Sequence, residues 1–345
     1  MDQSVGWTVS VLAAVVPTVC YVLVLWWLDR YEKEPLRLLS AAFLWGAIPA
    51  VLASVVAEIA LGAPLGAFGE AGAQLLGTSL LAPVVEELAK GAALLVLFLR
   101  PRSELDNVLD GVIYGGTIGF GFAMTENVLY FVSSLEQDSH TVLWVTILLR
   151  TIVFGLNHGM FTALFGAALG YARTARGGWV KWMAVPLGLL GAVAAHAIHN
   201  LFTSLSQMVC YSALISLVSD WAGVLIIGWV VVLAWRQEKR WITGHLRAEV
   251  EGGLISEDEY DVVGSYRRRV ATQWKALAGE GLNEAKHTAR LSHLATELAF
   301  RLERGDHANA EKLRQQIRSL RGTSAATLAT LTATDLGPGE YQSPQ

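Results

Sequence analysis

Long apolar stretches constrain this chain more than any other feature. Seven stretches are long enough to cross about 30 Å of hydrocarbon as helices. They lie at about 5–27, 38–62, 73–99, 108–133, 141–171, 182–205 and 210–235. Hydrophobic residues make up 53% of the chain and charged residues only 16%, a balance that soluble proteins rarely show. The sequence therefore predicts an all-α, polytopic membrane helix bundle with about seven transmembrane helices.

The connections between the stretches carry an alternating charge pattern. Lys and Arg occur in the connections at 28–37, 100–107 and 172–181, and none occurs at 63–72, 134–140 or 206–209. Because cytoplasmic loops are enriched in Lys and Arg, we expect the N-terminus outside and the C-terminal tail in the cytoplasm. This arrangement is that of a multi-pass protein of the cytoplasmic membrane.

The composition changes after Arg236. Residues 236–345 hold 16 Lys plus Arg and 15 Asp plus Glu, and apolar residues recur there at the three- and four-residue spacing of amphipathic helices. We expect a transmembrane domain at 1–237, a helical cytoplasmic tail at 238–321, and disorder at 322–345. No nucleic-acid-binding motif occurs, and we interpret "YRRRV" at 266–270 as a solvated helix face.

Several apolar stretches contain side chains that lipid does not tolerate. One charge near the bilayer centre costs roughly 2.5 to 3.5 kcal/mol on insertion scales, yet four consecutive stretches each contain a titratable group. These polar side chains are Glu86, Glu87 and Lys90 in the third stretch, Glu126 and Asn127 in the fourth, His158 in the fifth, and His196, His199 and Asn200 in the sixth. Because buried intramembrane charges usually pair inside a bundle, we expect one shared cavity.

Carboxylates beside imidazoles in a nearly dry site suit hydrolysis. Histidine nitrogens and glutamate oxygens can bind a divalent metal, here zinc, that activates a water. A glutamate can also act directly as the general base toward a water. We expect the metal to be held by ligands from among His158, His196, Glu126 and Glu86; the metal-free mechanism is the alternative.

Other polar residues receive supporting roles. We expect Lys90 to be a counter-charge that orients the glutamates, and His199 to be structural because it lies off the face of His196. Arg150 and Asp110 could form an interior or a snorkelling pair. The glycines of "YGGTIGFGF" at 114–122 predict close helix packing around the site.

Five motifs in order resemble the PrsW family of intramembrane proteases, which is distantly similar to CAAX-prenyl-protease and bacteriocin-processing membrane proteins. They are "LDRYEKEP" at 28–35, "EELAK" at 86–90, "LDGVIYGGTIGFGFAMTEN" at 109–127, His158, and "HAIHN" at 196–200. The distant CAAX-type relatives have a histidine where this chain has Glu126, so their ligand geometry does not transfer.

The resemblance implies cleavage of membrane-embedded or juxtamembrane peptide bonds in membrane-anchored proteins, such as the anti-sigma factors that some relatives cleave. It also implies a set of catalytic residues in this chain, namely Glu86, Glu87, Lys90, Glu126, His158, His196 and Asn200. The expected partners are this protein substrate and the lipid bilayer, and the oligomeric state is left open.

Rival classes account for fewer of these residues. A proton-coupled transporter also uses buried charges, but the inverted repeats typical of transporters are not evident. A membrane scaffold or chaperone would not need four titratable helices. A rhomboid-like serine protease could use "GTS" at 77–79, but it would leave the glutamates without a role.

Overall fold

The computed structural model describes residues 3–100, 104–136, 140–175, 177–206, 208–279 and 281–335. The described residues form helices and no strand, which confirms the expected all-α class. The chain divides into two compact units. The first contains residues 1–29 and 33–234, and the second contains residues 30–32 and 235–345.

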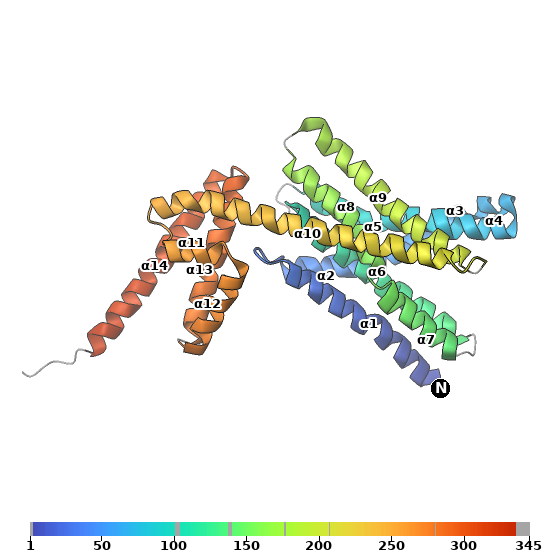
Figure 1. Ribbon diagram of the computed structural model, residues 1–345, viewed down its shortest axis with the longest axis horizontal. Helices are drawn as coiled ribbons and strands as arrows, with labels where there is room; N and C mark the ends of the chain where they lie inside the picture. Colours follow the sequence, from blue (N-terminus) through green and yellow to red (C-terminus); the bar gives the residue numbers. More distant parts are fainter. Residues whose placement is uncertain are drawn as a thin grey trace, which may run out of the picture. The chain divides into compact units, whose positions relative to one another are not determined.

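The first unit is a helix bundle with three π-helical segments and one 3₁₀ segment (Figure 1). Its elements are α1 (Gln3–Leu28), α2 (Leu36–Trp45), η1 (Gly46–Ala50), α3 (Val51–Gly62), η2 (Ala63–Phe68), α4 (Gly69–Leu76), η3 (Gly77–Leu81), α5 (Ala82–Leu99), α6 (Val108–Glu136), α7 (His140–Leu148), η4 (Leu149–Val153), α8 (Asn157–Thr174), α9 (Gly178–Leu205) and the first part of α10 (Ser212–Glu251).

Within the described residues, six helical runs are long and apolar enough to cross a membrane. One of them, Leu36–Leu99, has 64 residues, which is about three times the length that one crossing needs. This run contains both expected spans 38–62 and 73–99. Its helices α3 and α5 pack against each other, as the two arms of a hairpin do. The number of crossings and their orientation stay predictions.

Helix α6 is the centre of the first unit. It packs against α1, α2, α5, α7 and α8, and its residues from Leu109 to Ala123 are all buried. Three glycines make this packing possible. A Cβ built on Gly111 would lie 2.0 Å from the Gly166 carbonyl oxygen, and one on Gly119 would lie 2.1 Å from the His158 carbonyl oxygen. Gly115 is comparably crowded by Thr162.

These glycines lie four residues apart on one face of α6, so they allow the backbones of α6 and α8 to approach closely. The expected role of the glycine-rich motif at 114–122 is thereby confirmed for Gly115, Gly119 and Gly121. A Cβ built on Gly121 would lie 2.1 Å from the Phe43 carbonyl oxygen of α2. The register of α6 on α8 is set by backbone contact, and it fixes how far Glu126 and His158 lie from each other.

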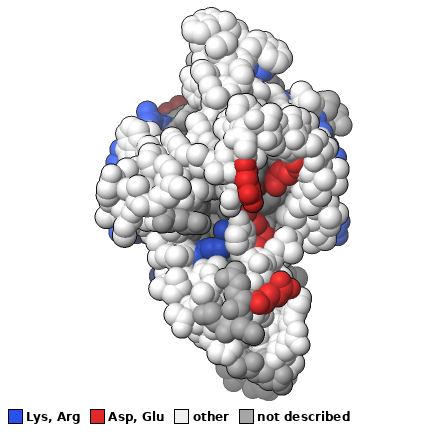
Figure 2. All heavy atoms as spheres, turned by 90° about the vertical axis from the view of Figure 1, so that its right-hand side faces the viewer, with Lys and Arg blue, Asp and Glu red and all other residues white. Residues whose placement is uncertain are grey.

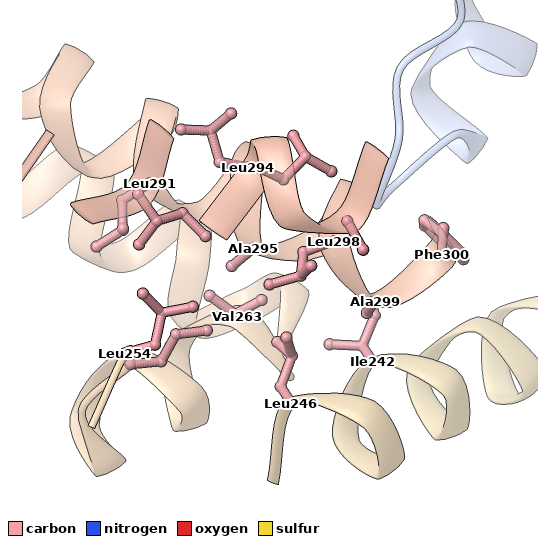
Figure 3. Packing of buried hydrophobic residues seen from close by; sticks show 14 of the residues in the cluster. Ile242, Leu246, Leu254, Val263, Leu291, Leu294, Ala295, Leu298, Ala299 and Phe300 are labelled. Atoms are coloured by element: carbon pink, nitrogen blue, oxygen red, sulfur yellow. The ribbon is translucent and has the colours of Figure 1, made fainter. Parts of the chain in front are cut away.

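The second unit contains the end of α10 with α11 (Glu257–Val263), α12 (Tyr266–Gly279), α13 (Leu282–Glu303) and α14 (His307–Asp335). The expected amphipathic helices are therefore present as α13 and α14. Figure 3 shows apolar residues of α13 packed with those of α10 and α11, and residues of α14 belong to the same cluster. We expected disorder at 322–345; α14 extends to Asp335, and residues 336–345 lie outside the described residues.

Residues 30–32 belong to this second unit although they follow α1. Tyr31 joins its apolar core, and the buried Arg269 donates hydrogen bonds to the carbonyl oxygens of Tyr31 at 3.4 Å and Val263 at 2.9 Å. The expectation of a solvated "YRRRV" face is therefore wrong for Arg269, although Arg267 and Arg268 are exposed. Burial lowers the pKa of Arg269 to about 10.

Gly111→Ala tests the backbone contact between α6 and α8. The added methyl group overlaps the Gly166 carbonyl, and overpacking of this kind costs about 1 to 3 kcal/mol. We expect a lower midpoint of thermal unfolding for the detergent-purified variant. Gly191→Ala in α9 is the matched control, because no heavy atom lies within 4 Å of its Cβ position. Equal losses of stability in the two variants would contradict this account.

Candidate active site

The first part of the site lies on α5. Glu86, Glu87 and Lys90 are all buried, and their side chains are 8%, 1% and 0% exposed. The Lys90 Nζ lies 3.1 Å from Glu86 Oε2 and 2.8 Å from Glu87 Oε1. Because the three residues are three and four positions apart, one helical turn places the ammonium beside both carboxylates. The expected counter-charge position of Lys90 is therefore present.

Glu126 forms the second part of the site, on α6. Its Oε2 lies 2.7 Å from Arg150 Nη2 and 2.7 Å from His158 Nε2. Arg150 also donates from Nε to Asn127 Oδ1 at 2.8 Å and lies over the Tyr130 ring at 3.8 Å. Arg150 lies in the π-helical segment η4, and π-helical insertions frequently occur at functional sites.

The expected pairing of Arg150 with Asp110 is wrong. Asp110 lies near the start of α6, where its carboxylate accepts hydrogen bonds from the backbone and side chain of Asn107. It is 16 residues before Glu126 in α6, which corresponds to about 24 Å along a helix. Asp110 therefore fixes the start of α6 and lies far from the guanidinium.

The two histidines complete the cluster from α8 and α9. His196 Nδ1 lies 3.0 Å from Glu87 Oε1, and its Nε2 lies 3.9 Å from Glu86 Oε2. His158 Nδ1 lies 3.2 Å from Lys90 Nζ. The two imidazoles are 5.0 Å apart and nearly perpendicular. Four helices thus bring Glu86, Glu87, Lys90, Glu126, His158 and His196 together, in the shared cluster that their placement in the sequence predicts.

Asn200 has a different position. Its side-chain amide donates to the Thr78 carbonyl oxygen at 2.9 Å. Asn200 therefore attaches α9 to η3, the segment that leads directly into α5. A catalytic role for Asn200 stays a prediction.

Side chains that the sequence analysis did not select also lie at the cluster or near it. Thr162 of α8 donates to Glu87 Oε2 at 3.0 Å, so both oxygens of Glu87 are bonded. The Phe161 ring stacks on His196 with centroids 4.7 Å apart. A further buried carboxylate, Asp220 of α10, lies in the seventh apolar stretch. Its charge in an apolar segment was the signal that could have identified it.

Glu86, His158 and His196 form a donor set that fits a divalent metal. Each offers one ligand atom, and these atoms lie within 4.8 Å of one another. Two imidazoles and one carboxylate are a known ligand set of catalytic zinc. One nitrogen of each histidine is bonded to a carboxylate outside this set, His196 Nδ1 to Glu87 and His158 Nε2 to Glu126. Carboxylates in that position orient histidine ligands in metalloenzymes, so the residues present fit the metal.

Figure 2 shows a face of the molecule on which most of the surface carries no charge. Acidic side chains gather there around a hollow, and a basic side chain is visible within it. Apart from basic side chains at its margins, the charged side chains of this face therefore lie around the hollow.

The first motif lies away from the cluster. Glu34, from "EKEP", accepts a hydrogen bond from the Tyr114 hydroxyl at 2.5 Å, and its backbone N–H donates to Asp29 Oδ2 at 2.6 Å. Tyr114 precedes Glu126 by 12 residues on α6, or about 18 Å along the helix. The motif therefore fixes the loop before α2 to α6. Burial raises the pKa of Glu34 to about 9 and that of Asp29 to about 7.

Comparisons with known proteins identify the family and relatives of this chain. The family model described as PrsW family intramembrane metalloprotease matches residues 34–235. Protease PrsW of Geobacillus kaustophilus is 26% identical over 163 residues, which are 47% of this chain and 66% of that protein. Protease PrsW of Bacillus subtilis is 24% identical over 201 residues, or 57% and 84% of the two chains. No solved structure matches the chain.

The fold and the buried cluster define a polytopic helical membrane protein with a Glu/His centre. The family model covers more than half of the chain, from Glu34 at the first motif to the middle of α10. The chain belongs to the PrsW family of intramembrane proteases. The match with the Geobacillus protein spans just under two thirds of that protein's length.

Glu34→Gln tests the buried carboxyl group. Glu34 has a pKa of about 9 in the folded protein and an ordinary value of 4.5, so the folded state keeps a proton that the unfolded chain releases. The stability that this group contributes therefore falls as the pH rises from about 4.5 to about 9, by up to about 1.4 kcal/mol per pH unit. Glutamine keeps a neutral side chain at every pH.

We expect the unfolding midpoint of Glu34→Gln to depend less on pH than that of the unsubstituted protein, with the largest difference near pH 9. Thermal unfolding of both proteins in detergent between pH 5 and 9 measures this. Glu70→Gln, at an exposed position in α4, is the control. Parallel curves for Glu34→Gln and the unsubstituted protein would show that Glu34 is ionised in the fold.

Proposed function

We propose that this protein is an intramembrane protease that hydrolyses peptide bonds of membrane-anchored proteins at the Glu86–His158–His196 cluster. The observation that carries the proposal is the buried donor set itself, with Glu87 and Glu126 behind its two histidines. A lipid-facing bundle has no structural need for two imidazoles and three carboxylates in one place, because each isolated charge raises the cost of insertion.

Glu86, His158 and His196 would hold the metal, which when bound supplies a Lewis acid and lowers the pKa of a water. The other residues prepare these ligands. Glu87 accepts a hydrogen bond from the N–H at His196 Nδ1, which leaves the Nε2 lone pair facing Glu86. Glu126 does the same at His158 Nε2 and leaves Nδ1 facing Lys90. Each imidazole is thereby fixed in one tautomer and one orientation.

The charges of the cluster also suit a cation. Glu86, Glu87 and Glu126 carry three formal negative charges, and Lys90 and Arg150 carry two positive ones. One negative charge is therefore left over. A metal cation bound by two neutral imidazoles would more than neutralise it, and a peptide oxygen that becomes negative during hydrolysis would find a positive environment.

The metal-free mechanism keeps one specific observation in its favour. Lys90 Nζ lies 3.1 Å from Glu86 Oε2 and 3.2 Å from His158 Nδ1, and these are groups that the metal would bind. In this mechanism Glu86 takes the proton from the attacking water. The histidines donate hydrogen bonds to the oxyanion. The transporter alternative has no support in the comparisons, because the matched family and relatives are proteases.

The substrate class and the location follow from the setting of the site. Its residues lie within helices long enough to span a bilayer, so the substrate is a membrane-anchored protein, of which anti-sigma factors are the example that the family resemblance supplies. We place the protein in the cytoplasmic membrane with its C-terminal tail in the cytoplasm, on the basis of the Lys and Arg distribution.

The variants Glu86→Gln and Glu87→Gln distinguish a metal ligand from a residue that orients a ligand. We expect both variants to lose at least about 100-fold in cleavage of a co-reconstituted single-span protein, while they accumulate normally in the membrane. Glu86→Gln should lose bound zinc because it removes a ligand. Glu87→Gln should retain a zinc site weakened about 10- to 100-fold, because Glu87 acts through His196.

Product analysis by mass spectrometry and zinc titration of the purified variants measure these two effects, with Glu70→Gln as the control. Wild-type rates of cleavage in both variants would refute the proposed site.

Chelation separates the two mechanisms. If the metal is required, a membrane-permeant chelator abolishes cleavage, and zinc restores it. Activity also falls as the pH drops through the histidine range, because protons compete with the metal for the imidazoles. Cleavage by reconstituted protein whose metal content has been measured before and after chelation tests this. Full activity in protein shown to be free of metal would establish the glutamate mechanism and leave the protease proposal in place.

A further inference from the structure

A second buried polar group lies outside the proposed catalytic cluster. Asp220 is on α10, in the seventh apolar stretch, and it is only 2% exposed. One of its oxygens, Oδ2, lies 2.7 Å from His199 Nδ1, 3.0 Å from Asn157 Nδ2 and 3.1 Å from Ser216 Oγ. Three helices, α8, α9 and α10, therefore meet at one carboxylate oxygen. None of the motifs described above includes Asp220.

The partners of Asp220 are next to the proposed histidine ligands in the sequence. Asn157 is the first residue of α8 and directly precedes His158. The chain is not helical at Phe154, between η4 and α8, where φ is −114°. The orientation of the first turn of α8 is therefore not inherited from the preceding helix. The bond from Asn157 to Asp220 helps to fix that turn, and with it His158.

His199 links Asp220 to α9, as Asn157 links it to α8. It lies one helical turn after His196, and the Phe161 ring stacks on His196 and also lies 6.0 Å from His199. The same ring is 5.9 Å from His158. One aromatic ring thus packs beside all three imidazoles, and it offers a path by which the position of His199 affects the other two.

We propose that Asp220 is a positioning residue of the protease, which sets the places of His158 and His196 through Asn157 and His199. This inference rests on the proposed function. The hydrogen-bond partners of Asp220 described above are Asn157, His199 and Ser216, none of which belongs to the catalytic cluster, so Asp220 acts on the cluster through α8 and α9. Helix α10 thereby becomes part of the catalytic unit.

A carboxylate is the side chain that these partners require. Its oxygens accept hydrogen bonds and donate none, so Asn157 must present its NH₂ group and His199 must carry its proton on Nδ1. An asparagine at position 220 would offer an NH₂ group as well. If the asparagine oxygen takes the place of Oδ2, the hydrogen bonds remain but lose the negative charge that strengthens them. If the NH₂ group takes that place, donor faces donor.

The test uses the full chain in detergent with Asp220→Asn, with Ser219→Ala as matched control. Ser219 is the neighbouring residue of α10, and its hydroxyl bonds only to the Ser216 carbonyl of the same helix. A third variant, Asn157→Asp with Asp220→Asn, exchanges the carboxylate and the amide between α8 and α10. The readouts are ¹⁵N imidazole NMR spectra without substrate, and kcat and KM for a single-span substrate.

We expect Asp220→Asn to weaken the hydrogen bonds to His199 and Asn157, and to shift the imidazole signals of His199, His158 and His196. We also expect a loss of about 10- to 100-fold in kcat with little change in KM, the size typical of residues that orient a ligand. Ser219→Ala should leave spectra and rates unchanged, and the exchange variant should recover at least part of kcat.

Unshifted His158 and His196 signals in Asp220→Asn would overturn the proposal, whether or not the protein cleaves the substrate. Shifted signals with an unchanged kcat would also overturn it. If the unsubstituted protein does not cleave, the proposed function fails, and the spectra still decide whether Asp220 positions the two histidines. If Asp220→Asn does not fold, the exchange variant provides the test. His158 and His196 signals like those of the unsubstituted protein would support the proposal, and different signals would refute it.

Discussion

The rest of the site depends on the ion pairs of the Lys90 ammonium group. This group is fully buried and lies within 3.2 Å of Glu86, Glu87 and His158. Removing one partner of a buried ion pair typically costs about 3 to 5 kcal/mol, because it leaves the other charge uncompensated. The ammonium therefore requires that α5 and α8 stay together. It also keeps two adjacent glutamates, whose charges repel each other, on one side of the same helix.

The contact of α6 with α8 supplies the geometry for these charges. Gly111, Gly115 and Gly119 permit direct backbone contact, and backbone atoms leave little freedom for the two helices to slide. The distance of 2.7 Å between Glu126 and His158 follows from that register. The π-helical segment η4 then turns Arg150 toward Glu126. A polar site in lipid is thus held by packing as well as by charge, as expected where hydrophobic burial between helices contributes little.

Local patterns were enough to find most of the fold and much of the site. The apolar stretches, the amphipathic helices α13 and α14, and the six clustered residues all follow from residue type and spacing within single helices. The predicted Arg150–Asp110 pair was wrong because opposite charge alone does not identify a partner. The carboxylate that meets Arg150 is Glu126, which lies 16 residues after Asp110 on the same helix. Tyr31 was missed because its partners in the second core lie far along the chain. Asp220 was missed although its charge in an apolar stretch marked it.

The sequence by itself determined which side chains must avoid lipid. The cost of exposing a charge or an imidazole to hydrocarbon is a property of each residue and its apolar neighbours in the chain. Only the tertiary structure decided which of these side chains meet. The pairing of Glu87 with His196, of Glu126 with His158 and of Asp220 with His199 depends on how each helix is rotated about its axis. That rotation is set by backbone contacts at glycines and by π-helical segments, and these depend on residues far apart in the chain.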